Sequence, residues 1–126
     1  MLRRAFALAT LCLLALPATA QVQRTFPQNA LRGAIVFAVA PEIVLNGRGS
    51  RLAPGARIRK DDNMITVPSA MLGGPFLVNY TVDLGGLVKD IWVLTPGEAS
   101  VQPWPTTRED ALAWSFDPIA QVWVKP

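Results

Sequence analysis

Three tryptophans near the C-terminus offer the strongest binding chemistry in this sequence. Trp104, Trp114 and Trp123 lie in a segment that is also rich in proline. Exposed indole rings at such spacing could form a platform for a glycan or small ligand, or a docking surface for another protein. The alternative is that this segment wraps the domain and tucks its rings into the edge of the core. The sequence favours burial but leaves the platform open.

A cluster of cations supplies a second candidate site. Arg57 and Arg59 belong to a basic stretch that starts at Arg48 and ends at Lys60. Guanidinium groups at alternate positions could bind an acidic glycan, a lipid headgroup or a phosphate. Charged residues on the outward side of hairpin strands also keep a domain soluble and protect strand edges. We favour this second interpretation because acidic residues follow the stretch directly.

Two carboxylates provide the one catalytic arrangement to consider. Asp83 and Asp90 flank the pair Gly85–Gly86, so a hairpin could bring them together. A pair of carboxylates is enough for glycoside hydrolysis, which needs no histidine. Acids beside a turn are usually exposed, however, and a domain of this size has little room for a deep sugar cleft. A carboxylate-dependent hydrolase is therefore the lesser alternative.

Histidine and cysteine, which many enzymes use in catalysis, are absent or nearly absent from this sequence. The sequence contains no histidine, and its one cysteine is Cys12, within the first twenty residues. Once that segment is removed, disulfides, zinc–thiolate sites, thiol nucleophiles and histidine bases are all excluded. We expect neither a metal site nor a cofactor.

The first twenty residues have the pattern of a cleaved signal peptide. Arg3 and Arg4 precede an apolar run over 5–16, and Ala18 and Ala20 provide the small residues that a signal peptidase reads. The run is too short to span a bilayer, which takes about 20 residues. We therefore predict cleavage near Ala20, a periplasmic location, and no integral membrane segment in the mature chain.

Removal of this segment changes the charge of the protein. The cations fall from 12 to 10 while all 9 acids remain, so the net charge drops from +3 to about +1. A nearly neutral chain lacks the positive field that attracts phosphate backbones. Nucleic acid is therefore not an expected partner.

Alternating apolar residues and turn signals predict a β-domain over 33–96. Asn46–Gly47 is typical of a tight hairpin turn, Pro54–Gly55 indicates a further turn, and Gly85–Gly86 joins two alternating strands over 76–82 and 87–94. About six short strands at this spacing suggest a small antiparallel sandwich or a partly open barrel.

The two ends of the mature chain differ from this domain. The polar residues 21–32 are expected to form a flexible arm. Residues 97–126 are expected to form an extension rich in proline and tryptophan, packed on or beside the domain. In it, the spacing of Thr106 and Glu109 resembles a capping box and predicts a short helix over 109–114, followed by a strand over 121–124.

The central block of the sequence carries a family resemblance. Its segments are Leu45-Asn46-Gly47, the run RLAPGARIR over 51–59, Asn63-Met64-Ile65, the run NYTVD over 79–83, and the strand over 88–95. This block resembles small exported proteins of Gram-negative bacteria that have no assigned activity. The resemblance implies a periplasmic protein but no functional residue. We expect it to act by binding or structural association, with an envelope protein or glycan as partner.

Overall fold

Most strands of this protein belong to one curved sheet. The computed structural model describes residues 24–126, so the predicted signal peptide, including Ala18 and Ala20, lies outside the described residues. Within them the sheet strands are β1 (Leu31–Phe37), β2 (Glu42–Leu45), β3 (Arg48–Arg59), β4 (Ile65–Thr66), β5 (Gly73–Val82) and β6 (Val88–Val93). A short 3₁₀ helix, η1 (Pro68–Met71), connects β4 to β5.

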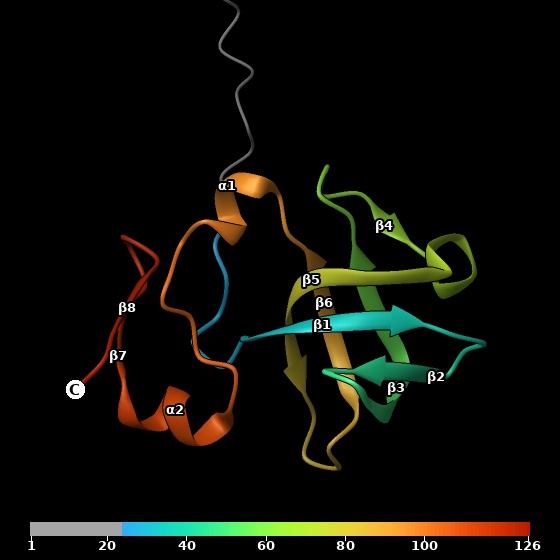
Figure 1. Cartoon of the computed structure of the whole chain (residues 1–126), viewed down its shortest axis with the longest axis horizontal. Helices are drawn as coiled ribbons and strands as arrows, with labels where there is room; N and C mark the ends of the chain where they lie inside the picture. Colours follow the sequence, from blue (N-terminus) through green and yellow to red (C-terminus); the bar gives the residue numbers. More distant parts are fainter. Residues whose placement is uncertain (1–23) are drawn as a thin grey trace, which may run out of the picture.

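The sheet closes on itself to form a barrel. Its strand order is β2-β1-β5-β6-β3-β4, and β2 also pairs with β3, so β1, β2, β3, β6 and β5 form a complete ring (Figure 1). The predicted mainly β fold is therefore confirmed, and of its two predicted forms the structure has the barrel. The pairs are antiparallel except for β3 and β6, which run parallel. The order of the strands around the barrel is a Greek key, as in five-stranded barrels such as the OB fold.

Period-two alternation fills the barrel interior with apolar side chains. The buried residues inside the barrel are Leu31, Ile35, Phe37, Ile43, Leu52, Ile58, Val78, Tyr80, Val88 and Ile91. Alternate residues of β5 show the pattern, since Val78 and Tyr80 face this core. Burial raises the pKa of the Tyr80 hydroxyl, and a hydrogen bond with Asn46 partly opposes that shift.

Two predicted hairpins are confirmed. Asn46 and Gly47 connect β2 to β3 with φ angles of 52° and 80°, the left-handed conformation that a type I′ turn requires. The second hairpin joins β5 to β6 through Asp83–Leu87. There Asp83 Oδ1 accepts hydrogen bonds from the backbone N–H groups of Gly85 and Leu87, both at 2.9 Å.

The turn predicted at Pro54–Gly55 is wrong. Strand β3 continues through this pair, with an irregularity in its pairing to β6 between Leu52 and Arg57. The start of β3 pairs with β2, whereas its end pairs with β4 and β6. Gly55, with a φ of 75°, lets the strand bend between these partners. A bulge therefore replaces the turn because one long strand completes the barrel.

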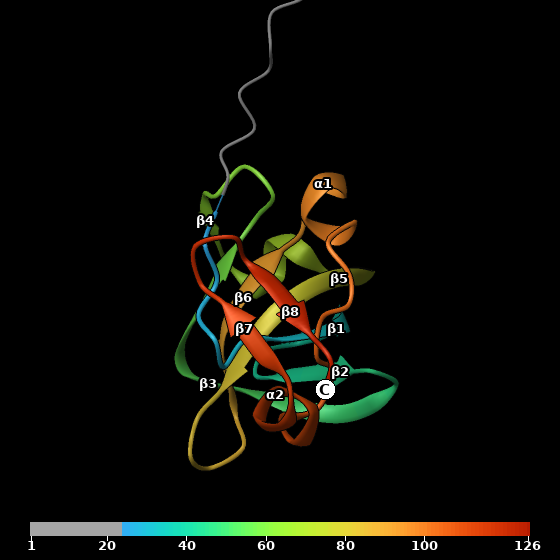
Figure 2. The same cartoon turned by 90° about the vertical axis from the view of Figure 1, so that its left-hand side faces the viewer.

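The C-terminal extension packs against the outside of β1, β5 and β6. It contains α1 (Pro96–Ala99), α2 (Arg108–Ala113), β7 (Ser115–Asp117) and β8 (Val122–Val124). Strands β7 and β8 form a small antiparallel sheet, which Figure 2 shows in front of the barrel with α2 below it. A second apolar core, formed by Phe26, Ala30, Leu94, Trp104 and Trp123, fills the space between extension and barrel.

Both short helices begin at threonine residues. The predicted helix over 109–114 is present as α2, but its capping residue is Thr107, which accepts a hydrogen bond from the Asp110 N–H, and not Thr106. A complete capping box occurs instead at α1, where Thr95 and Glu98 each bond to the other's backbone N–H. This capping box was not predicted from the sequence.

The prediction of a flexible arm over 21–32 is wrong for residues 24–32. Phe26 is buried, and its ring makes edge-to-face contacts with Trp92 at 5.6 Å and Trp104 at 5.8 Å. Arg24 forms an ion pair with Glu98. Apolar packing and a buried ion pair thus hold a segment whose polar composition suggested mobility. Residues 21–23 lie outside the described residues.

Among residues 24–126, no helix has the length and apolar character needed to cross a membrane.

Candidate functional site

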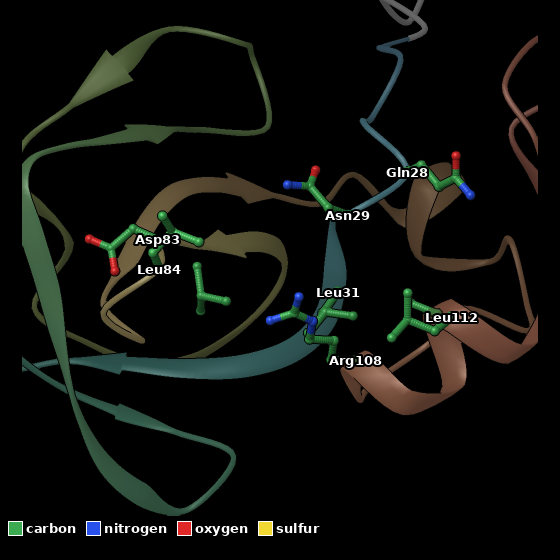
Figure 3. Close-up of a pocket in the computed structure, with 9 residues that line it drawn as sticks. Gln28, Asn29, Leu31, Asp83, Leu84, Arg108 and Leu112 are labelled. Carbon is green, nitrogen blue, oxygen red and sulfur yellow. The ribbon is translucent and has the colours of Figure 1, made fainter.

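One hollow in the described part of the chain lies between three segments that are distant in sequence. Its volume is about 450 Å³. Figure 3 shows the residues that line it: Gln28, Asn29, Leu31, Val82, Asp83, Leu84, Arg108, Ala111 and Leu112. They come from the N-terminal segment and the start of β1, from the end of β5 with the β5–β6 turn, and from α2. We refer to this site as the groove.

Apolar side chains dominate the walls of the groove. Leu84 at the β5–β6 turn is fully exposed, and Leu112 on α2 is 77% exposed, whereas Leu31 between them is buried. Burying a leucine side chain releases about 1.5–3 kcal/mol, so an apolar ligand gains free energy by covering these two. The volume also falls within the usual range for small-molecule sites.

The sequence of α2 directs one cation into the same groove. Arg108, Ala111 and Leu112 are spaced i, i+3 and i+4, which places them on one face of the helix. Glu109 and Asp110 are not among the groove residues, because their positions direct them to other faces. The helix therefore contributes a guanidinium and an apolar surface but no carboxylate.

The one carboxylate at the groove is already engaged. Asp83 Oδ1 accepts two backbone N–H groups of its own turn. Figure 3 shows its carboxylate directed away from Arg108, while the Arg108 guanidinium lies below Asn29. Arg108 takes part in none of the three ion pairs found among residues 24–126. It is thus an exposed cation facing an apolar groove.

A second hollow of about 440 Å³ is next to the groove and shares part of its lining. It shares Asn29, Val82, Asp83 and Leu84 with the groove and adds Pro27, Thr81, Lys89 and Asp90. Both carboxylates considered for hydrolysis line this hollow. Asp83 Oδ1 accepts two hydrogen bonds within its own turn, and Asp90 Oδ2 accepts one of 3.3 Å from the Thr81 hydroxyl. In the described residues, no cluster of three or more His, Cys, Asp or Glu side chains could hold a metal ion.

The C-terminal tryptophans lie mainly in the second core. Trp104 is 6% exposed, and its Nε1–H donates to the Ala30 carbonyl at 3.0 Å. Trp123 is 1% exposed and packs on Phe116 with ring centroids 4.6 Å apart. Trp114 is half-buried, with Lys125 Nζ 5.2 Å from its ring centroid. Trp104 and Trp123 therefore present no open ring face to a ligand.

The predicted cation pair lies on the outer face of β3, outside the groove. Arg57 is exposed and Arg59 is half-buried. In the sheet register, Arg57 is opposite Asp90, and Arg59 lies between Trp92 and Ile65. Neither arginine lines either hollow, so the structure does not bring Arg57 and Arg59 together with the tryptophans into one site.

A buried cation that sequence reasoning missed links the extension to the barrel. Arg32 on β1 donates to the Val101 carbonyl at 2.6 Å, the Glu98 carbonyl at 3.2 Å and Asn79 Oδ1 at 3.2 Å. Its guanidinium also lies 4.9 Å from the Trp104 ring centroid. Burial lowers the pKa of Arg32, and the Glu98 carboxylate partly offsets this. Arg32 thus helps to hold the extension that carries α2.

Comparison with known proteins gives no relative. No protein-family model, curated protein or solved structure matches this chain. The geometry and chemistry of the groove are therefore the basis for a functional proposal.

Proposed function

We propose that this protein is an exported, periplasmic binding protein that holds an apolar ligand in the groove and performs no catalysis. One observation carries the proposal: exposed leucines from two separate elements, Leu84 and Leu112, border the same hollow of about 450 Å³. Large apolar side chains gathered at a concave site are typical of ligand-binding surfaces.

The surroundings of the acids support binding over hydrolysis. A glycosidase needs one carboxyl group as an acid and a second as a nucleophile or base. Asp83 instead stabilises the β5–β6 turn, and Asp90 accepts a hydrogen bond from Thr81. The chain also lacks histidine, the commonest general base near neutral pH.

The periplasmic location is supported by the leader pattern of Arg3, Arg4, the apolar run and Ala18-Thr19-Ala20. Expression in a Gram-negative host, followed by mass spectrometry of the periplasmic fraction, tests it. We expect a mature chain that begins at Gln21. Recovery of the uncleaved chain in the cytoplasm alone would contradict this location.

The two exposed leucines provide the test of the binding site. We expect Leu84→Ser and Leu112→Ser each to weaken binding of the neutral fluorescent probe N-phenyl-1-naphthylamine by about tenfold, since each removes burial worth about 1.5–3 kcal/mol. Because both side chains are exposed in the free protein, the free energy of unfolding should change by less than about 0.5 kcal/mol. Fluorescence titration and urea unfolding measure the two effects.

Ile119 supplies a matched control. It is 94% exposed in the β7–β8 turn and lines neither hollow. Ile119→Ser should leave the affinity for the probe unchanged. If the probe binds Leu84→Ser and Leu112→Ser as tightly as the native chain, the groove is not the binding site.

A further inference from the structure

We propose that the ligand of the groove is an amphipathic carboxylate, specifically a medium-chain fatty acid whose carboxylate pairs with Arg108. This inference rests on the proposed function, because it requires the groove to bind an apolar ligand. It adds the polar group that the ligand carries and the residue that recognises it.

The charge of the groove favours an anion. Arg108 is exposed, and no carboxylate of residues 24–126 lies within ion-pair distance of it. The Asp83 carboxylate, although it lines the groove, is directed toward the backbone N–H groups of its own turn. A ligand carboxylate can therefore approach the guanidinium without displacing a protein partner. Guanidinium groups bind carboxylates through two parallel hydrogen bonds.

The neighbours of Arg108 suit the rest of such a ligand. Leu31, Val82, Leu84 and Leu112 provide apolar walls for a hydrocarbon chain. The Asn29 side-chain amide, which lies above the guanidinium in Figure 3, can donate a further hydrogen bond to a carboxylate oxygen. A single cation beside an apolar hollow thus complements a molecule with one anionic end and one apolar chain.

The volume of the groove sets the size of the ligand. At about 450 Å³ it lies in the lower part of the usual range for ligand sites. This space suits one chain of medium length and not a phospholipid with two long acyl chains. Decanoate is accordingly the probe for the anionic ligand, and decanol is the neutral molecule with the same number of carbons.

The test compares these two molecules by their displacement of N-phenyl-1-naphthylamine from the intact mature protein at low salt, below the concentrations at which either self-associates. We expect decanoate to bind about tenfold more tightly than decanol. Arg108→Gln should abolish that preference, so that the variant binds decanoate and decanol with equal affinity. Arg57→Gln, which alters an exposed arginine outside the groove, should preserve the preference.

The outcomes separate this inference from the proposed function. Equal binding of decanoate and decanol by the native chain would overturn the pairing with Arg108 but leave an apolar binding groove. A preference for decanoate that survives in Arg108→Gln would also overturn it. If neither molecule displaces the probe, the inference fails, and the proposed function fails as well only if Leu84→Ser and Leu112→Ser bind the probe as tightly as the native chain.

Discussion

Replacing Trp123 with alanine is expected to lower the free energy of unfolding by about 3–5 kcal/mol, the usual cost of removing a buried aromatic side chain. Trp123 is 1% exposed and contacts Phe116 and Trp104 through ring centroids 4.6 Å and 6.1 Å apart. The truncation leaves a large cavity in the second core, where β8 meets the barrel. Urea unfolding followed by circular dichroism measures the loss.

Val124→Ala is the matched control on the same strand. Val124 is 60% exposed, so its truncation should change the free energy of unfolding by less than about 0.5 kcal/mol. A loss below 1 kcal/mol for Trp123→Ala would contradict the packing described here. If that variant folded normally but lost ligand, the tryptophan platform would become the better explanation.

Replacing Arg32 with alanine is expected to lower the free energy of unfolding by about 3 kcal/mol, because one buried and two partly buried hydrogen-bond acceptors lose their donor. The carbonyls of Glu98 and Val101, together with Asn79 Oδ1, accept from its guanidinium. Asn79 is fully buried, so water replaces the guanidinium poorly there, whereas the two carbonyl bonds are partly buried. Equilibrium unfolding in urea again provides the measurement.

The exposed ion pair between Arg51 and Glu42 provides the control for Arg32. Its Nε–Oε1 distance is 2.8 Å, but the two side chains are 63% and 53% exposed. Pairs of this kind contribute less than about 1 kcal/mol, so Arg51→Ala should have a small effect. If Arg32→Ala and Arg51→Ala lowered the free energy of unfolding equally, burial would not explain a larger contribution of Arg32 to stability.

Trp123→Ala and Arg32→Ala should affect ligand binding in the groove as well as stability. Trp123 and Arg32 fix the extension on the outside of β1 and β5, and the extension carries Arg108 and Leu112 on α2. Local release of the extension would therefore separate α2 from Leu84. Variants that weaken this packing should lose ligand affinity in proportion to the population of the released state.

Local sequence signals were sufficient to predict much of the barrel. Asn46–Gly47 dictates a hairpin because few other residue pairs adopt two consecutive left-handed conformations. Alternation over 76–82 predicted a strand there, and in the structure Val78 and Tyr80 of that strand face the barrel core. The bend at Gly55 was misread as a turn, since only closure of the barrel requires β3 to continue beyond it.

Long-range packing explains the features that the sequence did not reveal. Phe26 lies in a polar segment, and its burial depends on rings at Trp92 and Trp104. Arg32 alternates with apolar residues of β1 and would face water if the extension did not cover that side. No local pattern states which face of a strand another part of the chain will cover.

The groove could not be predicted from the sequence either, because it combines residues at positions 28–31, 82–84 and 108–112, which are far apart in the chain. Its one local signal was Leu84, an apolar residue directly before the turn glycines, where polar residues are usual. The three C-terminal tryptophans were candidate binding residues because of their residue type alone. Residue type does not distinguish a ligand platform from a core when the covering segment is unknown.

The most direct test of the central claim is a titration of the ¹⁵N-labelled protein, residues 21–126, with decanol, followed by amide chemical shifts. A groove that binds an apolar ligand predicts shifts concentrated at 28–31, 82–84 and 108–112. The outer face of β3 around Arg57 and Arg59 should remain unperturbed. Shifts confined to that face, or no saturable shifts at all, would contradict the assignment of the groove as the binding site.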